Sequence, residues 1–313
     1  MSPLRPGAVP ALALALFLLV APCPPAAAAD STGCRILLLA NADHRGELMP
    51  CHCPGLEAGS LALRAGLLRG VRLGNRFVVG ADAGDFTPLP GDTAGVSSSA
   101  TILDALEAMG YDAIAPGEAE LLRGPEFLAE AASRLPLVCA NLKLGGAPAG
   151  SIPPLRVIER DGCRVVVTAY VDPLLYYEWP QALECPADSL LAIDPAQALR
   201  PILEGARAEG LPVILLAHAD AVSVAALLAD LPRPDVVVVG HDPGETRTAG
   251  RWESVLWVEP GPRSRTVAQV AFHAGRDGSA AVDSFRLTEL NQLKRWDRRI
   301  EALVRPPGGG GTR

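Results

Sequence analysis

The sequence has few aromatic residues and few basic ones. Phe, Trp and Tyr together make up 4% of its 313 residues, so a core must rest mainly on Ala, Leu and Val. Lys and Arg number 28 against 35 Asp and Glu, which gives a formal net charge of −7. This acidic balance argues against nucleic acid as a partner, because nucleic-acid-binding proteins normally carry a basic face. Hydrophobic residues (49%) and charged residues (20%) occur in the proportions of a packed globular protein, which excludes a disordered chain.

Long apolar runs are absent except near the N-terminus. There Arg5 precedes an apolar stretch over 8–21, and four alanines follow at 26–29. This three-part pattern is typical of a secretory signal peptide. We therefore predict a signal peptide over 1–29 and export to the periplasm or the extracellular space, with no transmembrane helix in the mature chain. Lipid anchoring through Cys23 is a less favoured alternative, because the proline before it fits that pattern poorly.

The rest of the chain alternates short apolar runs with amphipathic stretches, which is typical of α/β proteins. We expect strands over 35–40, 76–80, 112–116, 137–140, 213–216 and 236–239. We expect helices over 59–73, 97–109, 125–134, 194–210 and 221–231. The Asp161-Gly162 dipeptide predicts a hairpin of 156–160 with 163–171, and three antiparallel pieces follow between 255 and 286. The elements indicate one domain over 30–289, then a charged, solvated helix and a flexible Pro/Gly tail over 290–313.

Six cysteines remain after the signal peptide, and an even number permits disulfides in an oxidising compartment. Three of them lie in or beside apolar strand-like runs: Cys34, Cys139 and Cys163. In such positions a free cysteine often serves as a small hydrophobic residue, and this is our interpretation of the three.

Five short tracts place a side chain that can bind a metal directly after an apolar run. They are Asn41-Ala42-Asp43-His44, Gly84-Asp85, Gly117-Glu118-Ala119-Glu120, Ala217-His218 and Gly240-His241. Each tract alone is a common loop feature. Open α/β sheets, however, bind ligands at the carboxyl ends of their strands, and three of the protein's five histidines fall at these ends. Imidazole and carboxylate together suit zinc, manganese or iron, so the tracts predict a divalent metal site.

These tracts, read together from residue 36 to residue 241, resemble those of the calcineurin-like metallophosphoesterases, in particular the 5′-nucleotidase (UshA-like) branch. The resemblance implies an α/β fold of the metallophosphoesterase type, an α/β/β/α sandwich of two mixed sheets flanked by helices. It also implies metal-dependent hydrolysis of a small phosphorylated substrate.

Three positions depart from the pattern of that branch. Ala42 replaces the aspartate of the first tract (although Asp43 is next to it), Ala119 replaces the histidine that protonates the leaving group, and Pro243 replaces the last histidine. One metal of the family's pair would need Ala42, His44, Asp85 and Pro243, and two of these cannot ligate. The other would need Asp85, Glu118, His218 and His241, and all four can. The resemblance therefore implies one divalent metal, with a second metal in doubt, and a slow or specialised hydrolase.

Two further features leave alternatives open. Cys51 and Cys53 flank a histidine between two prolines, and their loop is similar to the Pro-Cys-x-Cys loop of some UshA-like proteins, a group that includes selenoproteins. This loop could form a structural disulfide, bind a soft metal or act as a redox-active thiol pair on a redox-active substrate. A non-catalytic binding module on the same fold is a third possibility. Asn141 follows its strand and could bind substrate, or else hydrogen-bond within its turn.

Overall fold

The structure, a computed structural model, describes residues 34–48, 60–89, 99–145, 152–177, 190–241, 247–261, 265–274, 280–290, 293 and 296–304. All of them belong to one compact unit, Thr32–Arg313. Among the described helices none has the length and apolar character needed to span a bilayer. The predicted signal peptide with Cys23, the loop with Cys51 and Cys53, Pro243 and the Pro/Gly tail lie outside the described residues.

Two mixed sheets form the centre of this unit. The first has the order β13-β12-β1-β2-β3, with β1 Cys34–Asn41, β2 Val78–Asp82, β3 Ala113–Ile114, β12 Thr266–Ala274 and β13 Ala280–Glu289. The second has the order β10-β11-β9-β8-β6-β5, with β5 Leu155–Arg160, β6 Cys163–Val171, β8 Val213–His218, β9 Val236–Gly240, β10 Thr248–Trp252 and β11 Val255–Glu259. A separate pair joins β4 Leu142–Leu144 to β7 Leu190–Ala192.

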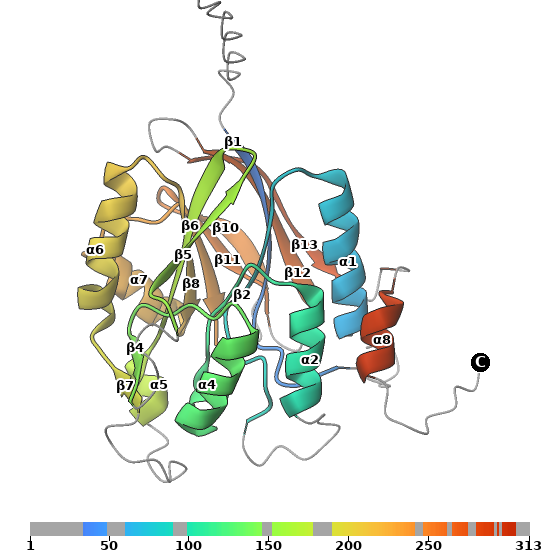
Figure 1. The fold of residues 1–313 in the computed structure, drawn as a ribbon. Coiled ribbons are helices and arrows are strands. Elements are labelled where there is room, and N and C mark those ends of the chain that lie inside the picture. The colour runs from blue at the N-terminus through green and yellow to red at the C-terminus, as the bar shows by residue number, and fades with distance from the viewer. Residues whose placement is uncertain are drawn as a thin grey trace, which may run out of the picture. The chain divides into compact units, whose positions relative to one another are not determined.

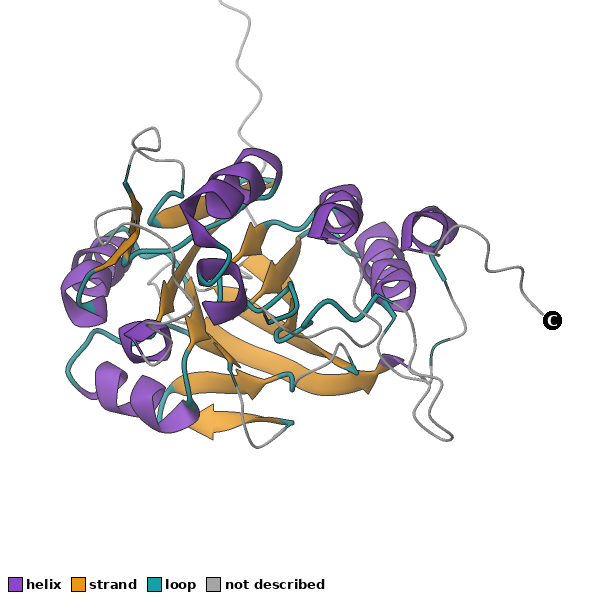
Figure 2. Ribbon diagram, turned by 90° about the horizontal axis from the view of Figure 1, so that it is seen from below, coloured by secondary structure: helices purple, strands orange, loops and turns teal. Residues whose placement is uncertain are grey.

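Helices flank the two sheets on both sides (Figures 1 and 2), and the described part of the chain has eight helices in all. They are α1 Leu61–Gly74, α2 Ser99–Met109, α3 Glu118–Leu121, α4 Gly124–Arg134, α5 Pro173–Tyr177, α6 Pro195–Ala208, α7 Ala221–Ala229 and α8 Arg298–Val304. Helix α1 packs on the first sheet, and α6 and α7 pack on the second. The predicted arrangement of two mixed sheets flanked by helices is confirmed.

The core explains why the central strands are apolar at every position. In β8, Ile214 and Leu216 belong to the cluster between the two sheets, whereas Leu215 and Ala217 belong to the cluster under α6 and α7. Both faces of the strand are therefore buried, so the sequence does not alternate between apolar and polar residues.

Two sequence predictions about single elements are wrong. The segment 137–140 is no regular strand: the Val138 N–H donates to Ile114 O at 2.9 Å, and the Ala140 N–H donates to Ala169 O at 2.7 Å. This segment thus passes from the first sheet to the second, and the next strand begins only at Leu142. The C-terminal helix is shorter than expected and is not solvated all round, because Ile300 and Val304 are buried against α1 and α2.

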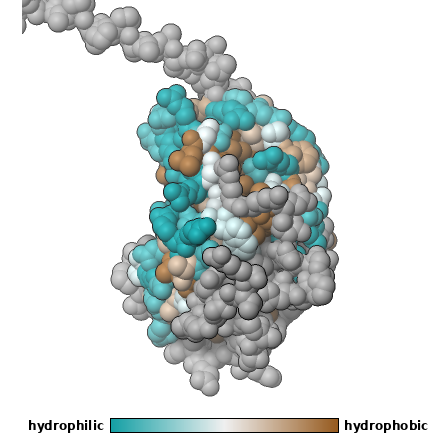
Figure 3. All heavy atoms as spheres, turned by 90° about the vertical axis from the view of Figure 1, so that its right-hand side faces the viewer, coloured by the Kyte–Doolittle hydropathy of each residue, from teal (hydrophilic) through white to brown (hydrophobic). Residues whose placement is uncertain are grey.

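The side of the molecule that carries α1, α8 and β13 is chemically mixed, as Figure 3 shows. Four large hydrophobic side chains are exposed on these elements or next to them: Leu73, Phe285, Trp296 and Leu303. Hydrophilic side chains are interspersed among the hydrophobic ones.

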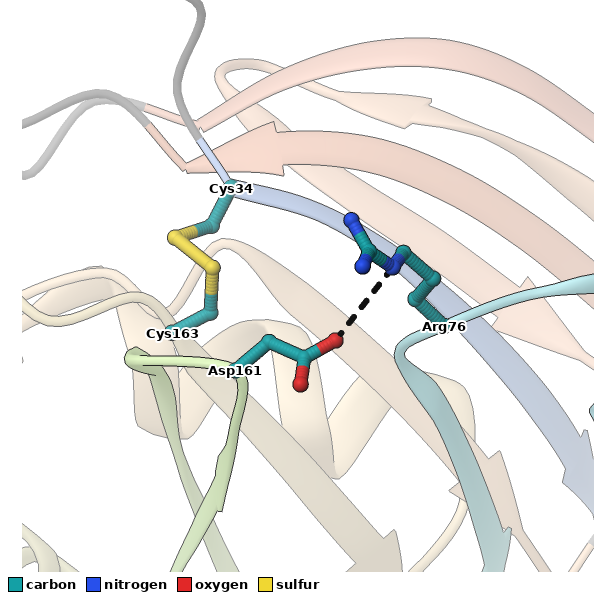
Figure 4. Close-up of a disulfide and its surroundings, with 4 residues drawn as sticks. All are labelled: Cys34, Arg76, Asp161 and Cys163. Atoms are coloured by element: carbon teal, nitrogen blue, oxygen red, sulfur yellow. Dashed lines mark ion pairs between the residues drawn. A yellow bond between two sulfur atoms is a disulfide. The ribbon is translucent and has the colours of Figure 1, made fainter. Parts of the chain in front are cut away.

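A disulfide between Cys34 and Cys163 joins the first residues of β1 and β6, and so joins the two sheets (Figure 4). Arg76 and Asp161 form an ion pair of 3.6 Å beside it, at the same end of the strands. The interpretation of Cys34 and Cys163 as free hydrophobic residues is therefore wrong. Cys139 is free and buried, as expected, and burial raises the pKa of its thiol to about 12.

Candidate metal centre

Side chains from four segments meet where the parallel strands of both sheets end. Asp85 follows β2, Glu118 begins α3, and His218 is the last residue of β8. The register of β8 with β9 pairs His218 with Gly240, which brings His241 next to it. The structure brings the four side chains together: one ligand atom from each lies within 4.8 Å of all the others.

The contacts within the cluster centre on Glu118. One of its oxygens contacts Nε2 of His218, and the other accepts a hydrogen bond of 2.9 Å from Nδ1 of His241. Nε2 of His218 also lies 3.5 Å from Oδ1 of Asp85. The side chains of Asp85 and His218 are fully buried, whereas that of His241 is 21% exposed. The cluster is therefore open to solvent on the His241 side.

Burial and mutual charge shift the pKa values strongly in this cluster. Burial raises the pKa of Asp85 well above its ordinary value, although the neighbouring His218 opposes this effect. Burial alone would lower the pKa of His218, but the carboxylates of Asp85 and Glu118 raise it well above its ordinary value. Burial likewise opposes ionisation of Glu118, yet His218 and His241 hold its pKa below the usual range. The two carboxylates thus require a positive charge between them, which a proton or a metal ion can supply.

The residues present fit a divalent metal ion. Oδ2 of Asp85 is buried and has no hydrogen-bond partner in the described part of the chain. A buried carboxylate oxygen without a partner is costly, and a cation bound there would remove that cost. Two carboxylates and two imidazoles are a donor set that zinc, manganese and iron accept.

His218 is oriented by a backbone carbonyl. Its Nδ1 donates to Ala83 O at 2.8 Å, because a carbonyl oxygen can only accept. The proton therefore sits on Nδ1 and leaves Nε2 as the atom that faces the carboxylates. His241 is held by its backbone N–H, which donates to Oδ1 of Asp43 at 3.0 Å.

Glu120 holds two of the ligand-bearing loops together, a role that sequence reasoning missed. Its carboxylate accepts from the N–H of Asp85 at 3.1 Å and from the N–H of Gly117 at 2.8 Å. It also accepts from both the N–H and the hydroxyl of Thr87 at 2.7 Å. The only signal in the sequence was its place two residues after Glu118.

A buried ion pair between α1 and β2 supports the loop that carries Asp85. Sequence reasoning missed this ion pair too. Arg64 on α1 donates to Asp82 Oδ2 at 3.3 Å, and both side chains are almost fully buried. Oδ1 of Asp82 accepts the N–H of Gly84, next to Asp85, at 3.1 Å. Burial raises the pKa of Asp82 to about 7, although the charge of Arg64 opposes the shift. No pattern in the sequence pairs a helix arginine with a strand aspartate.

The structure leaves two predicted site residues outside the cluster. His44 is fully buried and its Nδ1 donates to Phe86 O at 2.9 Å; burial lowers its pKa to about 3, so the ring is neutral. It is not a member of the four-residue group. The amide of Asn141 donates to Val171 O and Ile193 O and accepts from the N–H of Val171. These side-chain partners lie 30 and 52 residues away in the sequence, so the side chain of Asn141 ties its turn to the end of β6 and to the residue after β7, and these bonds are not the expected ones within its own turn.

Replacing Gly117 with alanine is expected to disturb the cluster. A Cβ at this position would lie 2.6 Å from Cε1 of His218 and would also meet Oδ1 of Asp85. Such overpacking costs about 1–3 kcal/mol of unfolding free energy, and displacement of His218 should weaken metal binding. Urea unfolding and zinc titration measure the two effects.

Gly205→Ala is the matched control, because Gly205 lies in α6 and a Cβ there meets nothing within 4 Å. This control should be stabilising by about 0.5–1 kcal/mol, since alanine is the better helix former. Equal effects of the two substitutions on zinc binding would contradict the tight packing inferred around His218.

Comparison with known proteins identifies the fold. No protein-family model and no curated protein matches the chain. Solved structures do: a 5′-nucleotidase precursor from Thermus thermophilus (TM-score 0.70, 19% identity) and the NAD nucleotidase of Haemophilus influenzae (TM-score 0.71, 14% identity). The calcineurin-like phosphoesterase YfkN from Bacillus subtilis is also similar (TM-score 0.66, 18% identity). The chain has the metallophosphoesterase fold.

The extent of these matches differs between the neighbours. The matches cover 86–87% of this chain. They cover 57% of the Thermus protein and 59% of the Haemophilus protein, so the chain spans less than two thirds of either nucleotidase. They cover 96% of the Bacillus phosphoesterase chain. The likeness establishes the metallophosphoesterase fold.

Proposed function

We propose that this protein is an exported, 5′-nucleotidase-like metallophosphoesterase with a degenerate centre that binds one divalent metal ion. Asp85, Glu118, His218 and His241 would hold the ion, which would be zinc, manganese or iron. The observation that carries the proposal is the convergence of these four side chains within 4.8 Å, across both sheets of a metallophosphoesterase fold. The unpartnered Oδ2 of Asp85 supports it.

A bound ion would supply an acidified water and would polarise a phosphoryl oxygen. The chain's own residues set the limits of the reaction. Ala119 is fully buried next to Glu118, and its N–H donates to Oδ1 of Asp85 at 3.0 Å. Its methyl group cannot protonate a leaving group, and the loss of a general acid costs about 10²–10⁴-fold in rate for a poor leaving group. Substrates should therefore be small phosphate esters with good leaving groups.

The disulfide supports the proposed export. A bond between Cys34 and Cys163 persists in oxidising compartments, such as the periplasm or the extracellular space. The signal peptide over 1–29, with lipid anchoring through Cys23 as its alternative, stays a prediction from the sequence. The same holds for the thiol redox or soft-metal alternative at Cys51 and Cys53, and for the binding module.

Hydrolysis assays on the zinc- or manganese-loaded protein test the proposal. An activated aryl phosphate, whose leaving group needs no proton, should be hydrolysed about a hundredfold or more faster than a nucleoside monophosphate. A chelator should abolish turnover, and metal analysis should give about one ion per chain, as four ligands predict. Two ions per chain, or equal rates on the two substrates, would contradict a degenerate one-metal centre.

A further inference from the structure

The loop that follows β1 has an unusual backbone conformation. Asp43 and Arg45 have positive φ values of 49° and 50°, and Gly46 has a φ of 71°. Glycine adopts this region freely, and Asp can hydrogen-bond locally there, but arginine has neither advantage. A residue held in such a conformation costs about 1–3 kcal/mol, and such residues cluster at functional sites. Arg45 is therefore the residue in this loop that needs an explanation.

The backbone of Arg45 is fixed directly beside the cluster. Its N–H donates to the carbonyl oxygen of Asp85 at 2.7 Å, and the N–H of Asp43 donates to Gly84 O at 2.9 Å. A Cβ on Gly46 would lie 2.7 Å from the ring of Pro88, so the loop packs closely on the segment after β2. These hydrogen bonds and this close packing hold the backbone of Arg45 next to Asp85, a proposed metal ligand.

No residue in the described part of the chain hydrogen-bonds to the guanidinium of Arg45 or pairs with it. The side chain is partly buried, yet its Nε is buried without a hydrogen-bond partner. Two other arginines near the site are committed to the scaffold: Arg64 pairs with Asp82, and Arg123 donates to the Thr87 hydroxyl and to Pro88 O.

The cluster is surrounded by acidic side chains, so a negatively charged substrate needs a positively charged group to bind there. Five carboxyl groups are buried at this edge of the sheets: Asp43, Asp82, Asp85, Glu118 and Glu120. Arg64 contacts Asp82, and His218 and His241 contact Glu118, so part of this negative charge is balanced within the protein. A phosphate dianion that approaches these carboxyl groups is repelled unless positive charge faces it. A guanidinium presents several donors in a planar fork that matches phosphate oxygens.

We infer that Arg45 binds the phosphate group of the substrate at the metal centre. The inference rests on the proposed function and names the residue that would select phosphorylated substrates. It explains both the strained backbone and the unused guanidinium of Arg45, since a substrate phosphate would be the missing partner.

Binding of inorganic phosphate to the zinc-loaded full-length protein tests this inference by calorimetry. Arg45→Asn removes the charge but keeps a residue that tolerates positive φ. It should weaken phosphate binding about tenfold or more, while zinc affinity and melting temperature stay unchanged. Arg45→Lys keeps the charge and should recover part of the affinity. Arg76→Asn is the control, because the Arg76 side chain is 92% exposed before β2, away from the strand ends that carry the cluster.

The outcomes separate the two proposals. One outcome is that the wild type, Arg45→Asn and Arg76→Asn all bind zinc normally and bind phosphate with equal affinity. This outcome would overturn the role of Arg45 but would not contradict the metal centre. A melting temperature of Arg45→Asn well below that of wild type would also overturn it, because the guanidinium would then be structural. Failure of the wild type to bind zinc, manganese or iron would overturn the metal centre, and the inference with it.

Discussion

Replacing His218 with alanine should abolish tight metal binding. The Nε2 atom of this residue contacts Glu118 and lies 3.5 Å from Asp85, and its ring is fixed by the carbonyl of Ala83. Loss of a residue that merely orients a ligand costs about 10–100-fold in metal affinity, so loss of the ligand should cost more than about a hundredfold. Zinc titration followed by calorimetry, with metal analysis of the purified variant, measures the loss.

His273→Ala provides the control for this substitution. His273 lies in β12, is partly exposed and pairs with Asp283 at 2.7 Å, outside the four-residue cluster. Zinc affinity should not change in this variant. If His218→Ala bound zinc as tightly as the wild type, the ion would have to lie elsewhere and the proposed function would fail.

The four residues of the cluster could be predicted from the sequence because of the geometry of parallel strands. Parallel strands bring their carboxyl ends to one edge, so residues that directly follow apolar runs are expected to meet there. Asp85, His218 and His241 satisfy this condition, and Glu118 begins the helix after β3. His44 satisfies it too but lies outside the group, because its ring turns to the carbonyl of Phe86. A position directly after a strand thus reduces the number of candidate metal ligands, but it does not determine where a side chain points.

The roles of Glu120 and Arg64, which support the cluster, could not be predicted from the sequence. These roles depend on contacts with residues that are distant in the sequence. Glu120 acts through the backbone of Asp85 and Thr87, and Arg64 acts through Asp82. An apolar run also does not reveal its partner: 137–140 has the composition of a strand, yet it connects the two sheets. The pairing of Cys34 with Cys163 likewise needs knowledge that β1 and β6 begin side by side.

Removing this disulfide by Cys34→Ser with Cys163→Ser should cause the largest loss of stability. The bond closes a loop with a sequence separation of 129 residues. By chain entropy, a loop of this length confers up to about 5 kcal/mol, and measured losses for native disulfides fall in the range of about 2–5 kcal/mol. Urea unfolding under non-reducing conditions should show this loss relative to wild type. Cys139→Ala is the control, because it removes a buried thiol that forms no disulfide.

Metal binding should survive in the folded double variant and partly offset its loss of stability. The disulfide lies at the first residues of β1 and β6, whereas the cluster lies where the parallel strands end. A ligand that binds only the folded state at a hundred times its Kd stabilises it by about 2.7 kcal/mol. Zinc at that excess should therefore raise the urea midpoint of the double variant, and the rise should vanish when His218→Ala is added. A rise that persists without His218 would mean that zinc stabilises the fold from another site.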